Sequence, residues 1–203
     1  MTKGKVPMGR AARITRTTSE TDVSVELDLD GTGRTDIDTG VPFFDHMLDA
    51  FGRHGMFDLT VHAKGDTEVD AHHTVEDCGI VLGQCFDKAL GEARGITRYG
   101  SVALPMDEAL VLAAVDISGR GQAHCELELP CARVGSFDTE LAEEFWIAFA
   151  ANAKLTLHLR SLAGRNTHHV LEASFKAAAR ALRQATEPDV RAAGQVPSTK
   201  GVL

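Results

Sequence analysis

Two copies of a short motif rich in histidine and glutamate have the residue types that bind metal ions. The first copy is Ala71-His72-His73-Thr74-Val75-Glu76-Asp77, and the second is Thr167-His168-His169-Val170-Leu171-Glu172-Ala173. On a helix, residues four positions apart lie on one face, so the first histidine and the glutamate of each copy form a chelating pair. The adjacent second histidine diverges and points toward a different ion. Both members of the pair recur after 96 residues, so the copies are in register and predict two metals.

The donor atoms of these motifs indicate which metals fit. A neutral imidazole and a carboxylate from each helix suit manganese, iron or zinc, whereas calcium and magnesium prefer oxygen ligands alone. One His-His-x-x-Glu by itself is more often the polar start of a helix than a set of ligands. Two copies in register favour metal binding.

Further ligands are needed, because two octahedral ions that each keep a position open for a substrate require about eight protein groups. His46, on a helix predicted to begin at Pro42, completes seven with the two motifs. We expect Glu144 to be the eighth, with a solvated role in the pair Glu143-Glu144 as the alternative. The predicted metal ligands are His46, His72, His73, Glu76, Glu144, His168, His169 and Glu172.

A cation beside the second motif indicates an anion-binding region. Lys176 lies four residues beyond Glu172 and projects along the ligand face, although an ordinary surface Glu–Lys pair is the alternative. The matching position of the first copy is Ile80, so only one copy carries the charge, which suits an asymmetric substrate with an acidic head. Guanidinium groups match phosphate oxygens, and the C-terminal segment offers hydroxyls and an ammonium group. Either arginine alone is usually a surface residue, and most polar C-termini have no such role, which are the alternatives. The predicted substrate-binding residues are Arg98, Arg120, Lys176, Ser198, Thr199 and Lys200.

The composition limits the class of protein. The chain has 203 residues, 43% of them hydrophobic, and a net charge of −8, without the basic runs of a nucleic-acid-binding protein. No apolar run approaches the ~18 residues that span a bilayer, so we expect no membrane partner. The four cysteines form no C-x-x-C pair and nothing before them resembles a signal peptide, so reduced thiols and a cytoplasmic location are expected.

The order of predicted elements repeats within the chain. In the first half, alternating residues predict a small antiparallel meander, followed by a helix, a strand and the first metal-binding helix. The second half repeats this order, with Thr139 expected to cap its first helix. Leu59-Thr60-Val61-His62 precedes the first motif by the same distance as Leu155-Thr156-Leu157-His158 precedes the second, and both histidines are expected to face solvent. The predicted strands are 11–30 (two), 34–38, 57–63, 110–117, 122–129, 132–137 and 155–159, and the predicted helices begin at 42, 72, 139 and 168.

We infer an internal duplication in which each half is β-β-β-α-β-α. The apolar face of each sheet must be buried against other elements. Four helices should therefore pack between two mainly antiparallel sheets in an α+β fold. The first repeat is predicted to span 1–95, after a loose arm over 1–10, and the second repeat 96–187. The tail, 188–203, is predicted to close on the active site.

The whole chain resembles the imidazoleglycerol-phosphate dehydratases of histidine biosynthesis. Besides the two metal motifs, the resemblance rests on Phe43-Phe44-Asp45-His46-Met47-Leu48 and Asp116-Ile117-Ser118-Gly119-Arg120. It implies a fold similar to domain 2 of ribosomal protein S5 and loss of water from imidazole glycerol phosphate to give imidazole acetol phosphate. It also implies two manganese ions per active site, bridged by the substrate imidazole, and a shell of about 24 subunits built from trimers. Many family members carry a histidine ligand where this chain has Glu144.

The same resemblance implies an acid/base role for Glu20, which on its own would be an ordinary edge-strand residue. The predicted catalytic residues are Glu20, Glu76 and Glu172.

Two other classes of protein fit the ligand set. A di-metal hydrolase would use the metals to activate water on a small phosphorylated substrate. A non-catalytic metal-holding shell protein would need the ligands but no cation for a substrate, and Lys176 and the Gly119-Arg120-Gly121 turn argue against it.

Overall fold

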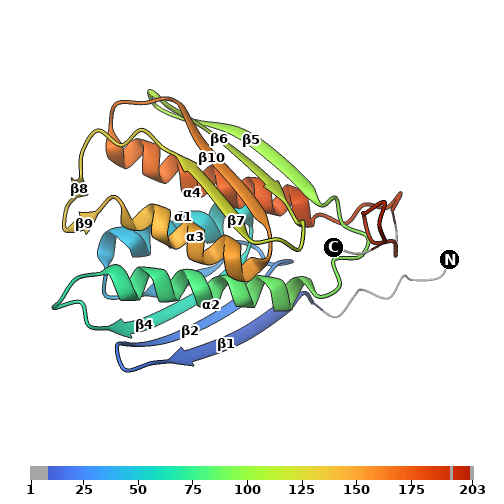
Figure 1. Ribbon diagram of the computed structural model, residues 1–203, viewed down its shortest axis with the longest axis horizontal. Helices are drawn as coiled ribbons and strands as arrows, with labels where there is room; N and C mark the ends of the chain where they lie inside the picture. Colours follow the sequence, from blue (N-terminus) through green and yellow to red (C-terminus); the bar gives the residue numbers. More distant parts are fainter. Residues whose placement is uncertain (1–8, 193, 202–203) are drawn as a thin grey trace.

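In the computed structural model, the described residues of the chain form four helices that lie between two four-stranded sheets (Figure 1). The α+β architecture predicted from the sequence is therefore confirmed. The structure describes residues 9–192 and 194–201. Most of the predicted N-terminal arm, and positions 193, 202 and 203 of the tail, lie outside these described residues. No helix in the described ranges is long and apolar enough to cross a membrane.

The first half forms one sheet and two helices. Its strands have the order β1-β2-β4-β3. β3 pairs in parallel with β4, so the predicted antiparallel meander is wrong in its third strand. A parallel pair needs a crossover connection, and α1 supplies it. The elements are β1 (Ala11–Thr17), β2 (Thr21–Asp28), β3 (Thr35–Asp38), α1 (Pro42–Gly55), β4 (Asp58–Gly65) and α2 (His72–Leu90).

The second half repeats this arrangement in the order β5-β6-β10-β7. β5 was not predicted, because Gly100 and Pro105 interrupt its alternating pattern. Both are compatible with its place at the edge of the sheet. A Cβ atom at Gly100 would lie 2.0 Å from the carbonyl oxygen of Ala181, so glycine lets this strand approach α4. The elements are β5 (Tyr99–Met106), β6 (Ala109–Asp116), β7 (Gln122–Glu126), β8 (Arg133–Val134), β9 (Phe137–Asp138), α3 (Leu141–Ala153), β10 (Thr156–Ala163) and α4 (Thr167–Thr186).

The connection before α3 differs from the prediction. Instead of a strand over 132–137, the chain makes the short hairpin β8–β9, with Gly135 at a positive φ of 62° in its turn. Thr139 does not cap α3: its hydroxyl donates to the carbonyl oxygen of Cys131 at 3.0 Å, and the N-cap residue is Glu140. The threonine thus closes the loop around the hairpin.

The sequence motif aligns residues 59–62 with residues 155–158, but the pairing of the strands shows that this alignment is displaced by two residues. Asp58 pairs with the last residue of β2, and its structural counterpart Thr156 pairs with the last residue of β6. His62 and His158 therefore occupy positions two residues apart on equivalent strands. Both point to solvent, as expected, because a shift of two preserves the face of a strand.

Both metal motifs lie at the same end of the molecule. β4 leads into α2 and β10 leads into α4, and both helices start at the left edge of Figure 1 and run to the right. The inward residues of the sheets, such as Val23, Val25 and Leu157, are fully buried against the helices. The sheets thus fix the level at which each helix begins.

Close contact between α2 and α3 closes the core. A Cβ atom at Gly79 would lie 2.7 Å from the carbonyl oxygen of Phe145, and one at Gly83 would lie 2.5 Å from that of Phe149. The two glycines, four residues apart on one face of α2, let the backbones approach. Phe145, Trp146 and Phe149 of α3 are fully buried beside them.

Gly83→Ala should therefore destabilise the protein by about 2 kcal/mol, because a methyl group cannot enter this contact without separating the helices. Urea denaturation of the metal-free protein would measure this. Lys88→Ala, at an exposed position of the same helix, is the control and should change the free energy of unfolding by less than about 0.5 kcal/mol. Equal stability of the two variants would contradict the close packing.

Candidate active site

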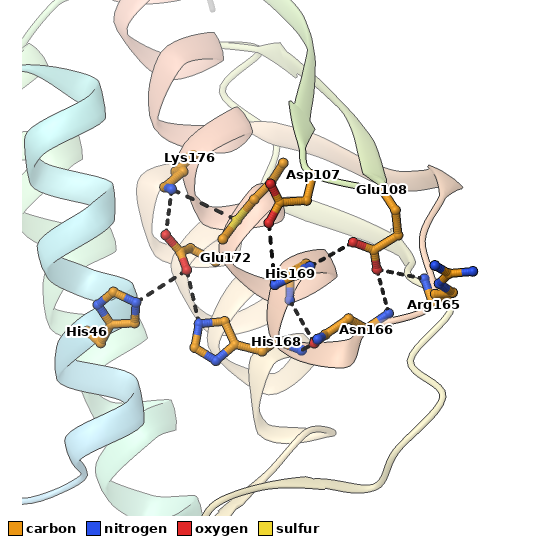
Figure 2. Close-up of polar contacts among 10 residues, drawn as sticks. His46, Asp107, Glu108, Arg165, Asn166, His168, His169, Glu172 and Lys176 are labelled. Carbon is orange, nitrogen blue, oxygen red and sulfur yellow. Dashed lines mark hydrogen bonds and ion pairs between the residues drawn. The ribbon is translucent and has the colours of Figure 1, made fainter.

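His46, His168 and Glu172 converge where α1 packs against the start of α4 (Figure 2). Their ligand atoms all lie within 4.8 Å of one another. Nε2 of His168 is 3.0 Å from Oε2 of Glu172, and Nε2 of His46 is 3.3 Å from the same oxygen. The ring of Phe43 packs edge-to-face against the ring of His168, with 5.2 Å between the ring centroids, and so supports the cluster. The predicted His–Glu pair of α4 and its partner on α1 are thus brought together.

Lys176 completes this cluster from the next turn of α4. Its ammonium lies 2.5 Å from Oε1 of Glu172, and the two side chains are only 18% and 10% exposed. The Glu–Lys pair considered as the alternative is thus formed, but it is largely buried in the cluster and is not exposed on the surface. Burial by itself would raise the pKa of Glu172, but hydrogen bonds from Lys176 and His168 outweigh burial and hold that pKa below its ordinary value. Glu172 is thus a buried, ionised carboxylate.

The cluster fits a divalent transition metal. Two imidazole nitrogens face one ionised carboxylate, and this mixed nitrogen and oxygen set suits manganese, iron or zinc. The corresponding residues of the first half, His72 and Glu76 on α2 and Glu144 on α3, form no such group of three within one chain, counting only described residues. Within the described part of a single chain, one such cluster is therefore assembled.

The second histidine of each motif turns away from its neighbour, as predicted. The rings of His72 and His73 are 88° apart, and those of His168 and His169 are 82° apart. Nδ1 of His73 lies 3.1 Å from Asp66, and Nδ1 of His169 lies 2.7 Å from Glu108. The hydrogen bond to its carboxylate raises the pKa of each histidine. In return, the hydrogen bond from His169 is the main cause that lowers the pKa of Glu108, to about 2.

Neither of these two carboxylates was predicted from the sequence. Asp66 stands in the loop after β4, seven residues before His73, and Glu108 stands in the turn between β5 and β6, 61 residues before His169. No local pattern marks them. Each leaves Nε2 of its histidine directed away from the carboxylate, which is the arrangement of histidines that bind metals.

Glu20 lies at the tip of the β1–β2 hairpin, beside the first motif. Its carboxylate is 3.9 Å from Nδ1 of His73, and its side chain is 53% exposed. Asp77, the residue after Glu76, anchors this hairpin: it pairs with Arg16 at 2.5 Å and accepts a hydrogen bond from the hydroxyl of Thr21. The hairpin that carries Glu20 is thus fixed directly to α2.

All the predicted phosphate-binding residues except Lys176 lie near the C-terminal end of α4, whereas the metal cluster lies at its start. Arg98 pairs with Asp116 at 2.7 Å and donates to the carbonyl oxygen of Pro197 at 2.8 Å, so the tail packs against the 95–98 segment. The hydrogen bond with Asp116 raises the pKa of Arg98. The backbone of Arg98 also bonds to Ala185, near the end of α4. The N–H of Ile117 donates to the carbonyl oxygen of Arg98, which places the following turn with Arg120 on this side, and Ser198, Thr199 and Lys200 directly follow Pro197.

The two groups of residues are too far apart to act together in one chain. Eighteen residues of α4 separate His168 from Thr186, which corresponds to about 27 Å of helix. The predicted closure of the tail on the active site does not occur within a single chain.

A model of the imidazoleglycerol-phosphate dehydratase family matches residues 39–182. The chain belongs to this family. It is 62% identical over 196 residues to the imidazoleglycerol-phosphate dehydratase of Acidiphilium cryptum, which covers 97% of this chain and 100% of that protein. The corresponding protein of Desulforamulus reducens is 58% identical over 196 residues, with the same coverage.

Solved structures of family members share the fold. The crystal structure of the Staphylococcus aureus dehydratase matches with a TM-score of 0.80 and 40% identity, covering 88% of this chain and 99% of that one. The Pyrococcus furiosus structure matches with a TM-score of 0.82 and 38% identity, covering 94% of this chain and 100% of that one. The resemblance noted in the sequence is confirmed, and the chain is a dehydratase.

Binding of a divalent cation should weaken as the pH falls, because an imidazole binds a metal only when it is neutral. The raised pKa values of His73 and His169 make protons compete at a pH above the ordinary histidine value of 6.5. Calorimetric titration with Mn²⁺ between about pH 8 and about pH 5.5 should show this loss of affinity. His124→Gln, an exposed histidine away from both motifs, should have the same pH profile as the unmodified chain. An affinity independent of pH would contradict the assignment.

Proposed function

We propose that this chain converts imidazole glycerol phosphate into imidazole acetol phosphate and water, with two Mn²⁺ ions per active site, in a cytoplasmic homo-oligomer. The observation that carries this proposal is the convergence of His46 and His168 on the buried, ionised Glu172. Membership of the family supports the reaction, and the donor types support manganese. Neither a nucleic acid nor a membrane takes part.

Eight groups would hold the metals. When bound, the ions would act as Lewis acids on the substrate's imidazole ring and so assist the loss of hydroxide from the neighbouring carbon. Glu76 belongs with His72, and Glu172 with His168, as chelating pairs. The set is His46, His72, His73, Glu76, Glu144, His168, His169 and Glu172.

The side chains of this protein would supply positioning and proton transfer. Lys176 keeps Glu172 ionised, so the carboxylate can serve as a ligand without first losing a proton. Glu20 is solvent-accessible, and its hairpin is anchored to α2, so it can take the proton from the substrate carbon and return it later. Arg98, Arg120, Ser198, Thr199 and Lys200 would bind the phosphate and orient the substrate.

Each active site would combine residues of different copies of the chain. The metal cluster and the phosphate-binding residues lie at opposite ends of α4, and one small substrate cannot bridge about 27 Å. In a closed assembly, one end of each chain can meet the other end of its neighbour. The metal cluster of one chain would then lie beside the phosphate-binding residues of the next. The resemblance to the family suggests about 24 subunits built from trimers.

Purified, manganese-loaded protein should convert imidazole glycerol phosphate into an enolisable ketone, which absorbance at alkaline pH would detect. Glu172→Gln should lower turnover by about a hundredfold or more, because the variant loses a ligand and the partner of Lys176. Glu143→Gln, at an exposed position of α3, is the matched control and should keep full turnover. Hydrolysis of the phosphate instead of dehydration would refute the proposed reaction.

Chelation of the metal should reduce the mass of the assembly, because ions shared between chains add their binding free energy to the contact between them. Light scattering with and without chelator would show a smaller species, a trimer, that re-forms the large one when Mn²⁺ returns. An unchanged mass would contradict shared sites.

Deleting residues 198–203 should raise KM by about tenfold or more and lower turnover, because the phosphate loses one charged donor and two hydroxyls. Manganese content and mass should stay unchanged, since the deletion removes no metal ligand. Kinetics equal to those of the full chain would refute a role for the tail.

A further inference from the structure

The internal duplication pairs Glu20 with a second glutamate. Residues of the two hairpins correspond at a distance of 88 positions: Thr17 pairs with Asp22 in the first, and Pro105 pairs with Leu110 in the second. Glu20 and Glu108 are also separated by 88 positions in the sequence. Both therefore occupy the tip of a hairpin, next to the second histidine of a metal motif.

In the second half, hydrogen bonds use both carboxylate oxygens of Glu108. Oε2 accepts from Nδ1 of His169 at 2.7 Å, and Oε1 accepts from the backbone N–H groups of Arg165 and Asn166 at 3.3 and 2.9 Å (Figure 2). The side chain of Asn166 in turn caps α4 by accepting from the backbone N–H of His168 at 3.0 Å. Glu108 thus fixes the ring of His169 and the loop that begins the helix.

In the first half, a different residue holds the histidine. Asp66 lies 3.1 Å from Nδ1 of His73, whereas Glu20 lies 3.9 Å from the same atom. The carboxylate of Glu20 accepts no hydrogen bond from the described residues. Asp66 belongs to the loop between β4 and α2, which has six residues; the loop between β10 and α4 has only three and carries no acid.

We propose that Glu108 and Asp66 are positioning residues that orient His169 and His73 for metal binding, and that Asp66 thereby releases Glu20 for proton transfer. A carboxylate that accepts from Nδ1–H fixes the tautomer with its lone pair on Nε2 and fixes the direction of that nitrogen. Two glutamates at equivalent positions thus have different tasks, because only the first half has the longer loop. The part of the proposal that concerns Glu20 rests on the proposed dehydration.

A second difference between the halves supports this division. Arg16, Asp77 and Thr21 join the first hairpin to α2. Their counterparts in the second half are Leu104, Ala109 and Ala173, of which the two alanines are buried in a small apolar cluster with Leu104 packed against them. Asp77 of this ion pair is 10% exposed and Arg16 is 35% exposed. An ion pair with a largely buried carboxylate is often no more stabilising than apolar residues, so its presence in one half is better explained by the position it imposes on Glu20.

The test compares three conservative variants by Mn²⁺ affinity and by turnover. Glu108→Gln keeps an amide oxygen for the backbone N–H groups but loses the charged acceptor of His169, and it should weaken Mn²⁺ binding by about 10- to 100-fold. Turnover should return at saturating Mn²⁺. Asp66→Asn should behave in the same way through His73, and it tests the idea independently if the first variant fails to fold.

Glu20→Gln should show the opposite pattern. Its Mn²⁺ affinity should equal that of the unmodified chain, and its turnover should stay low even at saturating Mn²⁺. Glu128→Gln, at an exposed position of the second half, is the control and should match the unmodified chain in both measurements. Circular dichroism would verify that each variant is folded.

Unchanged Mn²⁺ affinity in Glu108→Gln and Asp66→Asn would overturn the proposal, as would a large loss of affinity in Glu20→Gln. The affinity measurement needs no substrate. If the unmodified chain failed to dehydrate imidazole glycerol phosphate, the proposed function would fail, while the positioning roles of Glu108 and Asp66 would still be decided by affinity.

Discussion

The whole arrangement depends on one packing constraint: each sheet has a single apolar face, and the four helices must fill the space between these faces. Sheets alone would leave residues such as Val23 and Leu157 in water. The approach of α2 to α3 through Gly79 and Gly83 makes the helical layer thin enough for both sheets to cover it. Packing in this layer fixes the positions of the helices. It therefore also fixes the first turns of α2 and α4, which carry His72 and His168.

Duplication of the fold placed two similar motifs at one end of the molecule, and later differences gave them separate tasks. Lys176 stands opposite Glu172 in one half, where the other half has Ile80. A buried carboxylate without a partner would lose its charge, so Lys176 is the reason that Glu172 remains ionised in an apolar setting. Lys176, which the sequence suggested as a substrate-binding cation, therefore belongs to the candidate metal cluster through its contact with Glu172.

Distance within the chain has a direct consequence for assembly. The residues suited to metal and those suited to phosphate lie at opposite ends of the same helix, and a rigid helix cannot fold back on itself. In the proposed enzyme, the two sets of residues would therefore come together only where copies of the chain meet end to end. Under that proposal, folding of one chain and formation of its active site would be separate events, and bound ions would favour the second.

The sequence by itself determined the duplication, the helices that carry His72 and His168, and the divergence of neighbouring histidines, because these follow from helical periodicity and from residue type. It did not determine the parallel pairing of β3, the edge strand β5 or the shifted register of His62 and His158, which depend on partners distant in the chain. Only the tertiary structure brought His46 to Glu172 and set Asp66 and Glu108 beside their histidines. The physical reason is that a loop carboxylate has no periodicity of its own, so its role is decided by where the sheets and helices place it.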